Sequence, residues 1–84
     1  MSSKLDTEKY FKNKNKVADA LLDCIKQDDI DGFKDILKAY LDFNNKEAFY
    51  KRVGISRRTL YRMLEPEGNP SLENVAKLIS KLAA

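Results

Sequence analysis

Residues 44–64 constrain the fold more than any other part of the chain, because two short amphipathic segments meet there at one glycine. The stretch is NNKEAFYKRVGISRRTLYRML, and its glycine is Gly54. Glycine adopts a left-handed backbone without steric cost, so Gly54 predicts a tight turn between two helices. We expect the first helix over residues 46–52 and the second up to Leu64, with Ser56 as the N-cap of the second.

The rest of the chain shows the same helical periodicity. Apolar residues recur at three- and four-residue spacing over residues 17–27, 30–43 and 72–82. The acidic pair at residues 28–29 separates the first two segments, and Ser71 is a good N-cap for the last. No run alternates apolar and polar residues as a half-buried strand does. The sequence therefore predicts an all-α fold, a five-helix bundle.

The spacing also predicts which side of each later helix faces the core. In residues 46–64 the inward residues are expected to be Ala48, Phe49, Ile55, Leu60 and Met63. In the last helix the expected apolar face consists of Leu72, Val75, Ala76, Ile79 and Leu82. Leu78 lies off that stripe, where it is free to contact a partner.

Composition excludes several classes of protein. An 84-residue chain is one small domain. With one cysteine and no histidine, it offers neither a disulfide framework nor the usual zinc or Cys/His catalytic sites. Cys24 lies on the apolar side of its helix and is expected in the core. We therefore expect no enzyme, no metal and no cofactor.

Hydropathy gives no sign of a membrane or secreted protein. No apolar run approaches the roughly 20 residues that span a bilayer. The first residues lack the apolar core of a secretory signal. We therefore expect a cytoplasmic protein without a membrane segment.

The charge of the chain is distributed unevenly. Residues 44–64 contain six basic residues and one acid, a net charge of +5, whereas residues 28–43 have a net charge of −3. All four arginines lie between residues 52 and 62. Arginine forms bidentate contacts with phosphate and guanine, so this distribution favours a nucleic-acid partner.

A helix-turn-helix protein places its second helix in the major groove of DNA, with the first turn at the base edges. Here the second helix presents three arginines on its outward side, Arg57, Arg58 and Arg62. The start of the preceding helix should meet phosphate, because free N–H groups there favour an anion. In the helix-turn-helix at residues 45–64, we expect Asn45 and Lys46 to contact phosphate.

The first 16 residues, MSSKLDTEKYFKNKNK, are mostly polar and are expected to form a flexible N-terminal arm. Residues 17–84 then form the helical domain. Tyr10 and Phe11 are the exception within the arm. They either cover part of the core or dock on a partner.

One longer pattern is more specific than the turn alone. The segment GISRRTLYRML, followed by EGNPSL at residues 67–72, resembles the pattern GLSR..LY..L...GNP of the HigA-like addiction-module antidote proteins. Those antitoxins belong to the Cro/phage-repressor helix-turn-helix superfamily, with a lambda-repressor-like fold. The resemblance covers roughly residues 6–82, and the Gly-Asn-Pro loop is its most specific part.

The resemblance implies a homodimer that binds a palindromic operator in double-stranded DNA. It also implies a toxin of the RelE/ParE type as partner, which the antitoxin neutralises while repressing its own operon. By position, the resemblance implies base contacts from Arg57, Arg58, Tyr61 and Arg62. It implies phosphate contacts from Lys46, Ser56 and Thr59. Tyr10 and Phe11 lie where the family has an aromatic-leucine pair, which suggests a toxin contact.

Tyr50 departs from the superfamily pattern. It lies four residues before Gly54, where the superfamily usually has alanine because the two helices nearly touch. A tyrosine there must tilt outward or open the pair of helices. Two other functions stay open: a stand-alone phage-type regulator without a toxin, and a protein-interaction module that uses the acidic second helix and Leu78.

Overall fold

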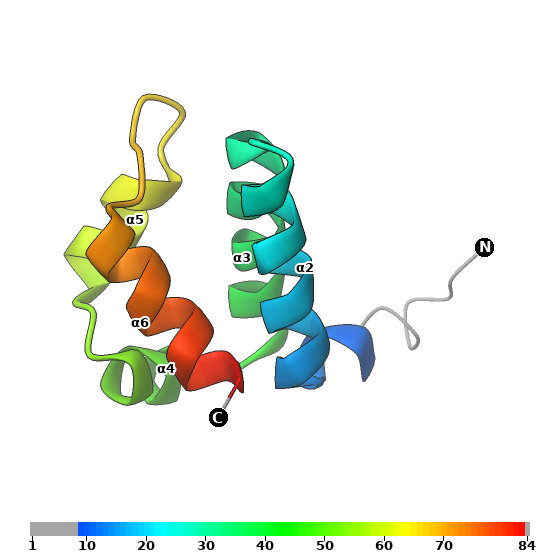
Figure 1. Cartoon of the computed structure of the whole chain (residues 1–84). Helices are drawn as coiled ribbons and strands as arrows, with labels where there is room; N and C mark the ends of the chain where they lie inside the picture. Colours follow the sequence, from blue (N-terminus) through cyan, green and yellow to red (C-terminus); the bar gives the residue numbers. More distant parts are fainter. Residues whose placement is uncertain (1–8, 84) are drawn as a thin grey trace.

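The computed structural model describes residues 9–83, and all regular secondary structure in that range is helical (Figure 1). Five helices follow in order: α2 (Lys14–Lys26), α3 (Ile30–Phe43), α4 (Lys46–Val53), α5 (Arg57–Leu64) and α6 (Leu72–Ala83). Residues 9–12 form a further helical turn before α2. The all-α prediction is confirmed, while the described residues contain one helical segment more than the five predicted.

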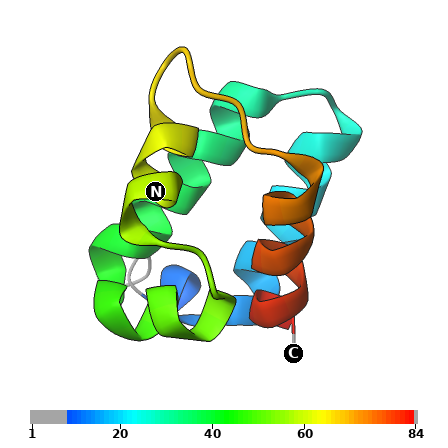
Figure 2. The same ribbon diagram turned by 90° about the vertical axis from the view of Figure 1, so that its left-hand side faces the viewer.

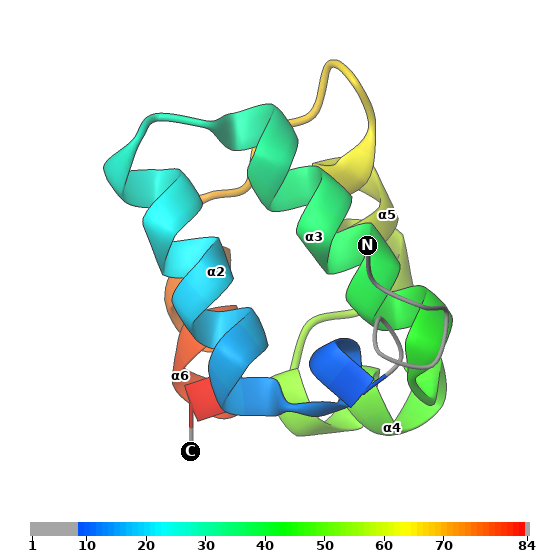
Figure 3. The ribbon, with the colours of Figure 1, turned by 90° about the vertical axis from the view of Figure 1, so that its right-hand side faces the viewer.

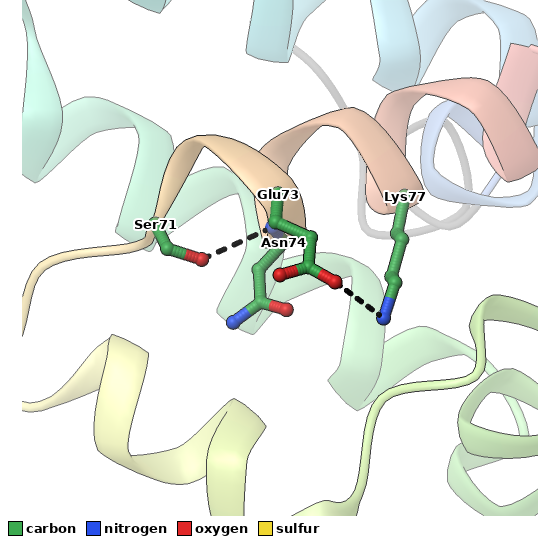
Figure 4. Close-up of polar contacts among 4 residues, drawn as sticks. All are labelled: Ser71, Glu73, Asn74 and Lys77. Carbon is green, nitrogen blue, oxygen red and sulfur yellow. Dashed lines mark hydrogen bonds and ion pairs between the residues drawn. The ribbon is translucent and has the colours of Figure 1, made fainter.

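Polar caps set most of the helix boundaries. Asp29 accepts a hydrogen bond of 2.9 Å from the backbone N–H of Gly32, which starts α3 at the predicted Ile30. Ser71 accepts one of 3.1 Å from the N–H of Asn74 at the start of α6, as expected (Figure 4). Each bond satisfies one of the unpaired N–H groups at a helix N-terminus.

The predicted start of the first helix at residue 17 is wrong. Asn13 accepts a hydrogen bond of 3.2 Å from the N–H of Lys16, so α2 begins three residues earlier, at Lys14. Residues 14–16 carry no apolar periodicity, and only the cap extends the helix into this polar stretch. Residues 1–8 of the expected arm lie outside the described residues.

The helices pack in an order that leaves α5 at one side of the molecule. The pair α2 and α3 packs side by side, and α6 lies against α2 (Figures 1 and 3). Helix α4 contacts α3 and α6, while α5 contacts α3. Figure 2 turns α4 and α5 toward the viewer, with α2 and α3 behind them. The segments at residues 46–64 therefore form one side of the fold.

A single core joins all five helices. Its fully buried side chains include Val17, Leu21, Phe33, Leu37, Leu60, Leu78 and Leu82. Cys24 belongs to this core, as predicted. Within the described residues, no helix is both long enough and apolar enough to cross a membrane.

The predicted inward face of α6 is partly wrong. Leu78 has no exposed surface, whereas Leu72 is 85% exposed and Ala76 is also exposed. The helix turns Leu78 and Leu82, one turn apart, into the core, and Val75 and Ile79 pack at its edge. Leu78 is therefore a core residue and not a surface for a partner.

The outer side of α6 carries an ion pair. The ammonium of Lys77 lies 3.5 Å from the carboxylate of Glu73, one helical turn away (Figure 4). Both side chains are largely exposed. A glutamate one turn before a lysine stabilises a helix by about 0.2–0.5 kcal/mol. The pair therefore supports the helix end that lacks core contacts at Leu72.

Candidate nucleic-acid interface

The turn between α4 and α5 is fixed from both sides. Gly54 has φ 71° and ψ 27°, the left-handed conformation that the sequence predicts, and its N–H donates to the carbonyl of Tyr50 at 3.0 Å. Ile55 is buried beneath the turn. Ser56 then begins α5 by accepting a 3.2 Å hydrogen bond from the N–H of Thr59. The direction of α5 relative to α4 is thus set by two caps and one buried side chain.

Helix α5 has one buried side and one basic side. Leu60 and Met63 are buried, as predicted, and Leu64 is buried with them. The four side chains expected to contact bases are all exposed: Arg57, Arg58, Tyr61 and Arg62. A helix with this division can lie in a groove of DNA while its other side stays anchored in the protein.

The start of α4 is arranged as an anion-facing helix end. Asn45 is the N-cap, and its side chain accepts a hydrogen bond of 3.0 Å from the N–H of Ala48. Lys46 follows and is exposed. Ala48 is exposed as well, so its predicted burial is wrong. The inward side of α4 consists of Phe49 and Val53, one turn apart.

The two expected phosphate ligands on α5 are hydrogen-bonded to each other. The hydroxyl of Ser56 donates to the hydroxyl oxygen of Thr59 at 2.9 Å and also accepts from the Thr59 N–H. The hydroxyl hydrogen of Thr59 then remains for an outside acceptor. The side chain of Thr59 is only partly exposed, and Ser56 is exposed.

Arg57 lies over the ring of Tyr61. Its guanidinium carbon is 5.5 Å from the ring centroid, within the range of a cation–π contact. The pKa of Tyr61 is lowered from its ordinary value, chiefly by the neighbouring hydroxyl of Tyr50, and further by the cations Lys46 and Arg57. The starts of α4 and α5 therefore share one electrostatic environment.

Tyr50 lies on α4 next to this group. Its ring packs at the edge of the core, and the side chain is only partly exposed. Its hydroxyl oxygen is buried and makes no hydrogen bond of ordinary length and angle with the described residues. Burial is the main cause that raises the pKa of Tyr50, and the phenol of Tyr61 raises it further.

Tyr10 and Phe11 lie at the C-terminal end of α3, next to Phe43 and Asn44. The ring of Phe11 stacks on Phe43, with centroids 5.6 Å apart and planes 3° from parallel, and Tyr10 meets Phe11 edge-on at 5.1 Å. The side chain of Asn44 donates to the carbonyls of Phe11 and Tyr40. Phe11 therefore covers part of the core, while Tyr10 remains 37% exposed.

The sequence does not predict a cavity that lies near α4. A cavity of about 170 Å³ lies beside the α4 N-cap and is lined by Lys14, Tyr40, Asn44, Asn45, Ala48, Phe49 and Arg52. No acidic residue is among these lining side chains, and Lys14 and Arg52 bring two positive charges to it. The sequence could not reveal it because Lys14 belongs to the polar stretch before the first periodic residue.

Between residues 9 and 83, no group of three His, Cys, Asp or Glu side chains is placed to hold a metal ion. Comparisons of the chain with protein-family models, with curated proteins and with solved structures give no match. The basis for a functional proposal is therefore the geometry of α4 and α5 together with the sequence pattern.

Proposed function

We propose that the chain is a sequence-specific DNA-binding protein in which α4, the turn at Gly54 and α5 form a helix-turn-helix. The observation that carries the proposal is the basic side of α5, where Arg57, Arg58 and Arg62 are exposed opposite the buried Leu60 and Met63. An α-helix with such a side matches the width of the major groove.

The mechanism follows from the positions of the donors. Helix α5 enters the major groove, and its arginines donate to the O6 and N7 atoms of guanine. The α4 N-cap region, with Asn45 and Lys46, meets the phosphate backbone, which favours a helix N-terminus. Ser56 and Thr59 contact phosphate at the start of α5, where the hydroxyl hydrogen of Thr59 is available.

DNA binding of this kind depends on two further features. A homodimer places two recognition helices about one helical turn apart on a palindromic operator. Much of the affinity comes from lysine and arginine neutralising phosphates, so binding falls steeply as salt increases. The net charge of +5 over residues 44–64 supports this dependence.

We further propose that the protein is an antitoxin, which neutralises a RelE/ParE-type toxin and represses its own operon. The support is the sequence pattern that joins α5 to the Gly-Asn-Pro loop. A stand-alone regulator has the same DNA interface, and the two are separated by testing whether co-expression with the neighbouring gene product relieves toxicity. The protein-interaction alternative loses its main residue, because Leu78 is buried.

The decisive experiment is a mobility-shift assay at about 150 mM salt. It compares DNA from just upstream of the gene with a scrambled duplex of equal length. One variant replaces Arg57, Arg58 and Arg62 with alanine, and a control removes the same charge at three exposed lysines elsewhere, Lys26, Lys38 and Lys81. Selective binding lost only in the arginine variant supports the proposal, whereas equal loss in both variants contradicts it.

A further inference from the structure

Three side chains of α4 and α5 form a group whose members influence one another and that the helix-turn-helix itself does not require. Tyr50 comes from α4, and Tyr61 and Arg57 come from α5. Arg57 lies over the ring of Tyr61, whose side chain is 41% exposed. Behind Tyr61, the hydroxyl of Tyr50 is buried. The group therefore extends from a buried phenol to an exposed guanidinium.

The buried hydroxyl of Tyr50 needs a polar partner. A hydroxyl removed from water without a hydrogen bond costs free energy, so buried hydroxyls are usually satisfied. The phenol of Tyr61 is the neighbouring polar group. Each phenol shifts the pKa of the other, upward for Tyr50 and downward for Tyr61, as when the O–H of Tyr50 points to the oxygen of Tyr61.

We propose that Tyr50 is a positioning residue whose buried hydroxyl holds Tyr61, so that the Tyr61 ring holds the Arg57 guanidinium in a fixed direction toward DNA. This inference rests on the proposed function. Its consequence is pre-organisation: an arginine already held in its binding direction loses less rotational freedom when it meets a base. The proposal also gives a role to a tyrosine where the superfamily pattern has alanine.

A purely structural role for Tyr50 makes a different prediction. If the side chain only fills the space between α4 and the core, phenylalanine serves equally well, because the two rings have the same shape. If the hydroxyl holds Tyr61, phenylalanine preserves the packing but releases Tyr61. Tyr50→Phe therefore separates the two roles in a variant that keeps the buried ring.

The first test is a spectrophotometric pH titration of the tyrosines in the free protein. The charged groups that act on the pair are Lys46, Glu47 and Arg57, and they are unchanged in every variant used. We expect the wild-type protein to have one tyrosine that ionises below the others, and Tyr61→Phe to remove it. Tyr50→Phe should move this ionisation upward, while the control Tyr10→Phe should leave it in place. An unchanged low ionisation in Tyr50→Phe overturns the proposal.

The second test measures discrimination between the operator and an operator with the Arg57-contacted base pair replaced. That base pair is the one whose replacement ceases to matter in Arg57→Ala. Tyr61→Leu removes the ring, and we expect about a two- to fivefold loss of discrimination, the range of an exposed cation–π contact. Tyr50→Phe should lose discrimination in the same direction, and Tyr10→Phe should lose none.

The two tests keep this inference distinguishable from the proposed function. If wild-type protein does not bind DNA selectively, the proposed function fails and the DNA role of Tyr50 fails with it, whatever the titration gives. If wild-type protein binds selectively but Tyr50→Phe changes neither the titration nor the discrimination, only the positioning role is overturned. A titration shift together with reduced discrimination supports both.

Discussion

The ammonium group of Lys34 donates a hydrogen bond of 2.8 Å to the backbone carbonyl of Glu65. Lys34 belongs to α3 and is only 5% exposed, while Glu65 is the C-cap of α5. The carbonyls at the end of a helix lack partners and carry partial negative charge, so a cation there is stabilising. This bond fixes the end of α5 opposite to its N-cap Ser56.

Loss of the Lys34 ammonium should destabilise the fold. Lys34→Met keeps the length of the side chain but removes one of the two donors to the Glu65 carbonyl and leaves only the N–H of Gly68. We expect a loss of about 1.5–3 kcal/mol in the free energy of unfolding, the range for a hydrogen bond to a charged group. Each kcal/mol lowers Tm by about 4–8 °C in a domain of this size. Thermal unfolding followed by circular dichroism measures this change in Tm. The control is Lys38→Met, an exposed lysine of the same helix, and equal Tm values for the two variants would contradict the role of Lys34.

Gly68 should tolerate no side chain. A Cβ atom built at this position overlaps the backbone carbonyl oxygen of Arg62, and the N–H of Gly68 donates to the carbonyl of Glu65 at 2.9 Å. Gly68→Ala must therefore move the loop away from the end of α5, which we expect to cost about 1–3 kcal/mol. Urea unfolding measures the difference in unfolding free energy between Gly68→Ala and the wild-type protein. An unchanged midpoint would show that the loop shifts freely and does not brace α5.

At Gly54, unlike at Gly68, an added side chain would meet no steric clash. No atom lies within 4 Å of a Cβ built there, so only the left-handed φ of 71° opposes a side chain. Gly54→Ala should cost about 1–2 kcal/mol. Gly54→Asn should cost less, because asparagine tolerates the left-handed region better. Equal unfolding midpoints for the two variants would indicate that the turn relaxes to a different backbone.

Features decided by neighbouring residues were predictable from the sequence. Asp29, Ser56 and Ser71 cap their helices through hydrogen bonds to residues three positions later. Gly54 is left-handed as expected. The exposed and buried sides of α5 follow from its own periodicity, because only one of its sides is apolar.

Features decided by distant residues were not predictable. Helix α6 has apolar residues around much of its circumference, so its orientation depends on packing against α2, and Leu72 and Leu78 exchanged their expected places. The burial of Lys34 depends on the end of α5, because its hydrogen-bond partner Glu65 lies 31 positions later in sequence. The mutual influence of the Tyr50 and Tyr61 phenols likewise depends on how two helices meet.

Cys24 should be unreactive in the folded protein. Burial raises the pKa of its thiol, and the carboxylates of Asp29 and Asp23 raise it further, so little of the reactive thiolate forms at neutral pH. Because the folded pKa lies above the unfolded one, the thiol's contribution to stability is fully present below the unfolded pKa and is lost as pH rises through the folded pKa. Iodoacetamide labelling at neutral pH should be much slower for native than for urea-unfolded protein. Equal rates would place Cys24 at the surface.

Alanine replacements of Arg58 and Lys46 should change DNA binding in different ways. Arg58 is on the exposed side of α5, where an arginine distinguishes one base pair from another by about 1–3 kcal/mol. Arg58→Ala should therefore relax preference at one operator position. In the proposed complex, Lys46 at the start of α4 contacts a phosphate that every sequence shares. Lys46→Ala should therefore weaken all duplexes alike and reduce the salt slope by about 1.

Competition binding with single-substitution operators, repeated over a series of salt concentrations, separates these two effects. The exposed Lys26→Ala variant, on α2, which packs against α3 and α6, serves as the control for the loss of one positive charge. If Arg58→Ala lost affinity equally on every duplex, Arg58 would contact phosphate and not a base. If Lys46→Ala changed the ranking of operators, the start of α4 would lie at base edges. Either result would contradict the proposed placement of α5 at the base edges and of the start of α4 at the phosphate backbone.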